Sequence, residues 1–167
     1  MALTDSPIII IGTGLAGYSL AREYRKLNKT QRLLILTADD GHSYSKPMLS
    51  NGFTKGKSAA ELSMSDPGKM AEQLDIEVRT FATVTQIEPK NQRISLGDEV
   101  ITYEKLVLAW GADVIHLELQ GEGASRVMSV NDLMDYRRIR EELEGKKQVV
   151  ILGAGLIEIG RASCRER

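Results

Sequence analysis

Two short runs of aliphatic residues dominate the first part of the chain. Ile8–Ile11 is four isoleucines in succession, and residues 33–37 read LLILT. Uninterrupted branched runs of this length are typical of strands that are buried on both faces of a parallel sheet. Between them, the segment YSLAREYRKLNK places Leu20, Tyr24 and Leu27 at helical intervals, with charged residues opposite. The pattern therefore predicts a strand, a helix with one apolar face, and a second parallel strand.

The pattern continues as an alternation of helical and extended segments. Residues 65–74, SDPGKMAEQL, predict a short helix that is capped by Ser65 or Asp66 and has Pro67 at its first position. A strand over 76–79 and an antiparallel meander over 83–102, with turns at PKNQ and GDE, are predicted to follow. Three further elements are predicted after the meander: an apolar strand over 105–111, a helix over 131–145 and a strand over 148–152. Together these elements predict an α/β fold whose sheet is interrupted by a meander.

A glycine-rich loop, Gly12-Thr13-Gly14-Leu15-Ala16-Gly17, joins the first strand to the first helix. In such a loop the first glycine permits a tight turn, the second lets the backbone approach a pyrophosphate, and the third lets the helix pack against the strand. Asp39 lies 22 residues after Gly17, at the end of the second strand. This spacing fits an acid that accepts hydrogen bonds from a ribose, a role that Asp39 or Asp40 can fill. The unit therefore predicts a dinucleotide site.

Composition excludes several other classes of protein. The chain has 167 residues, enough for one domain or one and a fraction, and its net charge of −1 does not indicate a nucleic-acid partner. No apolar run approaches the roughly 20 residues of a membrane span, and the start lacks the features of a signal peptide. The single cysteine, Cys164, excludes a disulfide framework, and His42 and His116 lack neighbours at metal-ligand spacing. We expect a cytoplasmic protein with no metal site.

The segment after the second strand carries no thiol. Residues 41–53 read GHSYSKPMLSNGF, with serines and an asparagine but no cysteine. A relay of electrons through a cysteine pair is therefore excluded for this segment. Lys46 is either a surface residue before a loop proline or a cation that stabilises negative charge on a bound cofactor or its phosphates.

Six segments resemble one family, the rubredoxin–NAD(+) reductases, which are FAD flavoproteins that pass electrons from NADH to rubredoxin. The segments are IIGTGLAG, TADDG, SYSKPMLS, DPGKMAEQL, YEKLVLAWGA and VILGAGLI, and they occur in that order over residues 8–157. The resemblance implies an FAD-binding Rossmann-like fold of the two-dinucleotide-binding type. It also implies FAD as cofactor, NAD(H) as substrate, rubredoxin as partner and a pathway role in alkane hydroxylation.

The resemblance further implies roles for individual residues. The loop Gly12, Thr13, Gly14, Leu15, Ala16 and Gly17 would hold the FAD pyrophosphate. Ala38 and Asp39 would contact the adenosine end, Val84 the adenine through its backbone, and Lys46 the flavin side. Trp110 and Gly111 would lie beside the cofactor at the end of their strand. Gly153 and Gly155 would open a second dinucleotide loop, for NAD.

The same resemblance divides the chain into parts. Residues 1–118 would be the FAD-binding region with its meander, 119–147 a linker and crossover helix, and 148–157 the start of an NAD-binding domain. Residues 158–167, EIGRASCRER, are identical to the translation of a common short-read sequencing adapter that begins AGATCGGAAGAGCG and is preceded by one G. We expect that this tail is not part of the natural protein, and that the natural residue at position 158 is glycine. The chain as printed is then truncated, with weak FAD affinity and little or no reductase activity.

Three alternatives stay open at this point. The acceptor could be a ferredoxin or a flavorubredoxin instead of rubredoxin. The chain could be a non-catalytic FAD-binding module or an inert truncated product. The choice between NAD and NADP depends on a residue that follows the second strand of the NAD domain, which the sequence does not reach.

Overall fold

The computed structural model describes residues 6–115 and 117–153. Gly155, His116, Cys164 and the tail over 158–167 therefore lie outside the described residues. The chain forms two compact units. Unit 1 comprises Met1–Ser43 and Ser65–Gly111, and unit 2 comprises Tyr44–Met64 and Ala112–Arg167.

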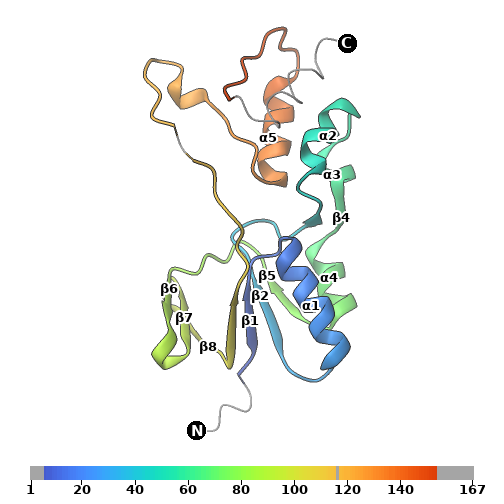
Figure 1. Ribbon diagram of the computed structural model, residues 1–167, viewed down its shortest axis with the longest axis vertical. Coiled ribbons are helices and arrows are strands. Elements are labelled where there is room, and N and C mark those ends of the chain that lie inside the picture. Colours follow the sequence, from blue (N-terminus) through green and yellow to red (C-terminus); the bar gives the residue numbers. More distant parts are fainter. Residues whose placement is uncertain (1–5, 116, 154–167) are drawn as a thin grey trace. The chain divides into compact units, whose positions relative to one another are not determined.

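A four-stranded parallel sheet forms the centre of unit 1 (Figure 1). Its order is β5-β2-β1-β9, and its strands are β1 (Ile8–Ile11), β2 (Leu33–Leu36), β5 (Glu77–Arg79) and β9 (Lys105–Leu108). Strand β1 pairs with β2 on one side and β9 on the other, so that Ile10 faces Ile35 and Val107 in register. The predicted parallel α/β sheet is confirmed.

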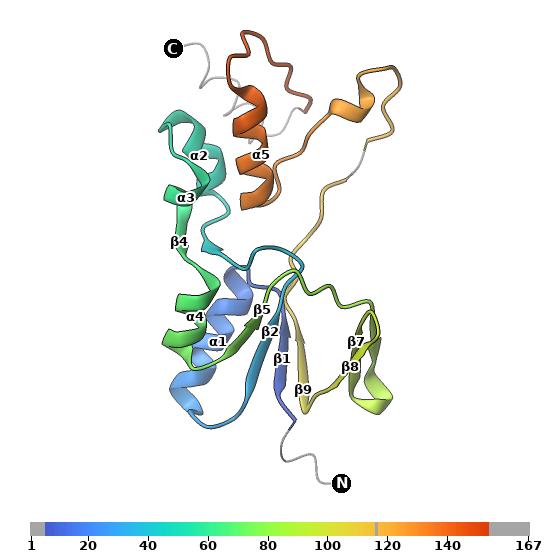
Figure 2. The same ribbon diagram turned by 180° about the vertical axis from the view of Figure 1, so that it is seen from behind.

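The four isoleucines of β1 alternate between two different layers. Ile8 and Ile10 pack with helices α1 (Leu15–Leu27) and α4 (Pro67–Leu74). Ile9 and Ile11 pack with the meander on the other face, which consists of strands β6 (Gln86–Glu88), β7 (Arg93–Leu96) and β8 (Glu99–Thr102) and the 3-10 turn η2 (Pro89–Asn91). Figure 2 shows the sheet lying between these layers. Both sides of β1 are thus buried, as its sequence predicts.

The buried face of α1 differs from the one that the sequence predicts. The residues that α1 buries are Gly17, Tyr18 and Ala21, whereas Leu20 is exposed and Leu27 is 87% exposed. Tyr24 is the one predicted residue that packs against the core, and only partly. The helix lies close to the sheet through small residues, so the larger leucines do not fit beneath it.

Three helices form the core of unit 2. They are α2 (Met48–Thr54), α3 (Ala59–Leu62) and α5 (Leu133–Leu143), and they enclose a cluster around Leu49, Leu62 and Tyr136. The sequence predicts α5, with Asn131 or Asp132 as its cap, but not α2 or α3; the cap is Asp132. The start of α3 does carry a signal, because Ser58 and Glu61 form a capping box. Strands β3 (Ser43–Tyr44) and β4 (Ser63–Ser65) pair with each other, and η3 (Ala124–Arg126) is a single 3-10 turn.

Residues 148–152 do not form the strand that the sequence predicts. This segment has no assigned secondary structure and pairs with no strand among the described residues, and Val150 is 93% exposed. A strand requires a neighbour to satisfy its backbone N–H and C=O groups, and an apolar pattern alone does not supply one.

Tyr18 joins α1 to the loop after β2. Its side chain is 1% exposed, and its hydroxyl donates a 2.6 Å hydrogen bond to the carbonyl oxygen of Gly41. Burial, together with the negative charge of Asp39, raises the pKa of Tyr18 from 10.0 to about 12. Ionisation of this phenol is therefore unfavourable in the folded protein.

The raised pKa predicts how the contribution of Tyr18 to stability depends on pH. The unfolded chain releases this proton near the ordinary pKa of 10.0 and the folded protein near 12, so the contribution is complete below pH 10.0 and is lost between these values. We expect Tyr18→Phe to lower the free energy of unfolding by about 1 kcal/mol at pH 8. The gap between the two proteins should shrink by pH 11.5, as denaturant titrations at both pH values would measure. A gap that is constant with pH would contradict this account.

Candidate functional site

Two glycines of the loop between β1 and α1 are required by the protein's own packing. Gly12 has a φ of +112°, and a β-carbon added there would lie 2.2 Å from the carbonyl oxygen of Ala109. A β-carbon added at Gly17 would lie 1.9 Å from the carbonyl oxygen of Gly12. Neither position can hold a side chain unless the backbone moves, so these two glycines fix the loop against α1 and the end of β9.

Gly14 differs from the other two. It has a φ of −60° and a ψ of −176°, a conformation that any residue adopts, and no other atom lies within 4 Å of the position that its β-carbon would occupy. Packing against the rest of the fold gives no reason for glycine here. Open space beside this backbone is what a ligand that approaches the loop closely requires.

The open space lies at the amino end of α1. Gly14 is the N-cap, and no side chain caps the helix. The first N–H groups of an α-helix have no acceptor within the helix and carry the positive end of its dipole. Leu15 and Ala16, which begin the helix, are exposed. The loop and the helix end together present donors suited to a phosphate group.

A chain of hydrogen bonds joins the loop to the end of β2. The hydroxyl of Thr13 donates to the hydroxyl of Thr37 at 3.1 Å, and that of Thr37 donates to Oδ1 of Asp39 at 2.6 Å. Oδ1 of Asp39 also lies 3.2 Å from the hydroxyl of Thr13 and accepts the N–H of Gly41 at 2.9 Å. Every bond that Asp39 accepts here ends on Oδ1. Among the described residues none engages Oδ2, which can accept hydrogen bonds from a ligand.

The two candidate carboxylates at the end of β2 have different surroundings. Oδ1 of Asp40 lies 3.1 Å from Nδ1 of His42 and accepts the N–H of His42. Asp40 is thus engaged with the residue that follows the turn, whereas Asp39 is fixed toward the glycine loop through Thr13 and Thr37. The sequence leaves the choice open, and the geometry favours Asp39 as the ribose acceptor. Thr37 was missed as a site residue; its position directly after a buried strand is the signal that could have identified it.

Most other candidates lie at the same end of the unit 1 sheet. Ala38 is exposed directly after β2, and Val84 packs partly against the cluster of Ile9 and Ile11. Trp110 follows β9 and is 62% exposed, and Gly111 has a φ of +78°. The structure thus gathers these residues and the glycine loop at the carboxyl ends of parallel strands, where open α/β sheets bind their ligands.

Two candidates lie in unit 2. The ammonium group of Lys46 donates a 2.6 Å hydrogen bond to Oδ1 of Asn131, whose amide in turn donates to the carbonyl oxygen of Ala112 at 3.1 Å. Asn131 was missed as a partner of Lys46, because the two residues are far apart in the sequence. Gly153 is exposed, with a φ of +140°.

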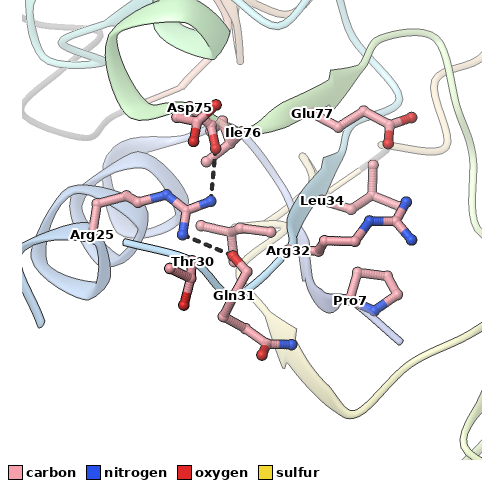
Figure 3. A pocket seen from close by; sticks show the side chains of 10 residues that line it. Pro7, Arg25, Thr30, Gln31, Arg32, Leu34, Asp75, Ile76 and Glu77 are labelled. Carbon is pink, nitrogen blue, oxygen red and sulfur yellow. Dashed lines mark hydrogen bonds between the residues drawn. The ribbon is translucent and has the colours of Figure 1, made fainter. Parts of the chain in front are cut away.

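A hollow lies at the opposite end of the unit 1 sheet, and the side chain of Arg25 stabilises its walls (Figure 3). The guanidinium of Arg25 crosses it and donates to four backbone carbonyl oxygens, those of Leu74, Asn28, Gln31 and Asp75. These bonds join the carboxyl ends of α1 and α4 to the turn before β2. Because its donors are already engaged, Arg25 has little left to offer a ligand.

The described residues give no indication of a metal or membrane site. No cluster of three or more histidine, cysteine, aspartate or glutamate side chains over 6–115 and 117–153 could hold a metal ion. No helix in the same part of the chain is both long enough and apolar enough to span a membrane.

Comparisons with known proteins identify relatives over most of the chain. The chain is 54% identical over 151 residues to the rubredoxin-NAD(+) reductase of Alcanivorax borkumensis, covering 90% of this chain and 40% of that protein. It is 34% identical over 155 residues to the nitric oxide reductase FlRd-NAD(+) reductase of Vibrio vulnificus, covering 93% and 41%. The chain therefore spans about 40% of the length of these curated relatives.

Solved structures of similar fold are also matched over about 40% of their length. The NADH:rubredoxin oxidoreductase of Clostridium acetobutylicum matches with a TM-score of 0.78 and 27% identity, over 95% of this chain and 41% of that one. A chain of the covalent putidaredoxin reductase–putidaredoxin complex matches with a TM-score of 0.82 and 25% identity, over 96% and 40%. The family described as pyridine nucleotide-disulphide oxidoreductase matches residues 6–163. The chain belongs to the pyridine nucleotide-disulphide oxidoreductase family.

Proposed function

We propose that this chain is the FAD-binding part of a flavoprotein that takes electrons from NADH and passes them to rubredoxin. The observation that carries the proposal is Gly14, a glycine that no packing contact requires, beside open space at a helix end that no side chain caps. A dinucleotide whose pyrophosphate rests on this backbone explains both features. The identity of 54% to a rubredoxin-NAD(+) reductase supports the choice among dinucleotides and among acceptors.

Each candidate residue would bind one part of the ligands. Gly12 to Gly17 and the first turn of α1 would hold the pyrophosphate, Oδ2 of Asp39 the adenosine ribose, and Ala38 and Val84 the rest of the adenosine end. Trp110 and Gly111 would lie beside the cofactor. Lys46, held by Asn131, would act on the flavin side, and Gly153 and Gly155 would begin the site for NAD(H). When bound, FAD would accept a hydride and release electrons singly.

The proposed route leads directly from flavin to an outside acceptor. Residues 41–53 contain no cysteine, so this segment offers no thiol pair to relay electrons. Relatives at 54% and 45% identity are named for rubredoxin, and one at 34% for a flavorubredoxin. Rubredoxin is therefore the proposed partner, and flavorubredoxin or a ferredoxin the alternative. The proposal includes a cytoplasmic location and a role in alkane hydroxylation.

Binding of nucleotides to the 167-residue chain tests the site. We expect FAD and ADP to bind, because both carry a pyrophosphate and an adenosine, and FMN, which lacks both, not to bind. Gly14→Ala should weaken FAD binding by at least about tenfold, because a methyl group would occupy the space of the pyrophosphate. It should change the free energy of unfolding by less than about 1 kcal/mol, because the only local cost is that alanine caps a helix less well than glycine. Calorimetric titration and denaturant unfolding measure the two effects.

Gly17→Ala is the matched control. The added methyl group would meet the carbonyl of Gly12 and not the ligand space, so this variant should lose stability by about 2 kcal/mol or more. The proposal fails if Gly14→Ala binds FAD as tightly as the parent chain, or if FMN binds as well as FAD.

The electron acceptor requires a separate assay with the coding sequence as read from the source DNA beyond the codon for Ile157. We expect NADH-dependent reduction of rubredoxin with a kcat/KM at least about tenfold higher than for a ferredoxin or a flavorubredoxin. The loss of visible absorbance of oxidised rubredoxin follows the reaction. A higher kcat/KM for flavorubredoxin would replace rubredoxin by the alternative acceptor.

A further inference from the structure

Phe81 has a backbone conformation that is unusual for its residue type. Three non-glycine residues in the described part of the chain have positive φ, namely Asp75, Phe81 and Gln92. Asp75 ends α4 and Gln92 ends the turn η2, positions at which polar residues adopt this conformation readily. Phe81 has a φ of +52°, ends no helix, and carries a bulky aromatic ring. Such an outlier requires an explanation.

The surrounding backbone holds Phe81 in this conformation. Its N–H donates to the carbonyl oxygen of Asp39 at 3.0 Å, and the N–H of Ala82 donates to the carbonyl oxygen of Thr37 at 2.8 Å. These bonds join the segment after β5 to the segment after β2. The segment after β5 is thereby fixed against the segment that carries Asp39, and the left-handed residue cannot relax.

The ring of Phe81 is not buried by the turn that holds it. Phe81 is 66% exposed, whereas Ala82 and Val84, in the same segment, pack partly against the core. Hydrophobic packing within unit 1 therefore does not account for the choice of phenylalanine. Glycine would adopt this φ without strain, and a polar residue would suit the exposure.

The position of Phe81 relates it to the dinucleotide site. It follows β5 and is hydrogen-bonded to Asp39, the residue whose Oδ2 is available at the end of β2. A ribose bound by Asp39 would bring its base near this segment. A planar adenine has an aromatic face that stacks favourably on an exposed phenyl ring.

We propose that the ring of Phe81 is the stacking surface for the adenine of the dinucleotide held by the glycine loop, and thus selects adenine over smaller bases. The inference rests on the proposed function, because it assigns one part of the same ligand. It explains both anomalies of Phe81. The exposure provides a free face for the base, and the left-handed backbone aims the side chain differently from its core-facing neighbours.

The test compares binding of ADP and UDP, which share the diphosphate and ribose but differ in the size of the base. We expect the parent chain to prefer ADP, and Phe81→Gly to weaken ADP binding by about tenfold with a much smaller effect on UDP. Phe81→Tyr keeps the ring and should keep the preference. The melting temperature of Phe81→Gly should not fall, because glycine relieves the left-handed strain.

Asp75→Gly is the matched control, because it relieves a φ of +50° at the opposite end of β5. It should leave the ratio of ADP to UDP affinity unchanged. An unchanged ratio in Phe81→Gly would overturn the inference and leave the proposed function intact. Failure of the protein encoded by the source DNA, read beyond the codon for Ile157, to bind either FAD or ADP would overturn the proposed function itself.

Discussion

The carboxyl end of the unit 1 sheet depends on one contact between backbones. There the carbonyl oxygen of Gly12 occupies the position that a β-carbon of residue 17 would take. The contact is possible only because residue 17 is glycine. It brings the first turn of α1 directly onto the end of β1, so that the uncapped donors of the helix face the carboxyl ends of the strands. Gly12 makes a second contact of this kind with Ala109, which fixes the end of β9 beside the same loop. The placement of the site therefore follows from the absence of two β-carbons.

The same constraint explains which parts of the fold could be predicted from the sequence. Strand β1, the glycine loop and β2 are set by neighbours in the chain, and all three were predicted. The face of α1 was not, because the close approach at Gly17 admits only small residues such as Ala21 beneath the helix and leaves Leu20 and Leu27 outside. The pattern of large apolar residues favours the wrong face when a helix packs this closely. Hydrophobicity predicts that a helix is amphipathic, but packing distance decides which residues lie beneath it.

Features that depend on distant partners could not be predicted. The choice between Asp39 and Asp40 depends on the hydroxyls of Thr13 and Thr37, which meet only after the parallel strands have paired. Residues 148–152 have the composition of a strand, but no strand lies beside them in the described part of the chain. A parallel strand is a property of a pair and not of a segment. Helix α3, in contrast, was missed although its capping box is local and visible in the sequence.

At Gly14 and Phe81 the residue present is not the one that the local backbone and packing would favour. At Gly14 the backbone would accept any residue, and glycine is present. At Phe81 the backbone favours glycine, and a phenylalanine is present. Each choice sacrifices some stability, since a needless glycine loosens the unfolded chain and a left-handed phenylalanine strains the folded one. Both residues lie at the carboxyl ends of the strands, joined through Thr13, Thr37 and Asp39. Two unfavourable choices of opposite kind at one end of a sheet are best explained by a ligand that needs empty space at one position and an aromatic surface at the other.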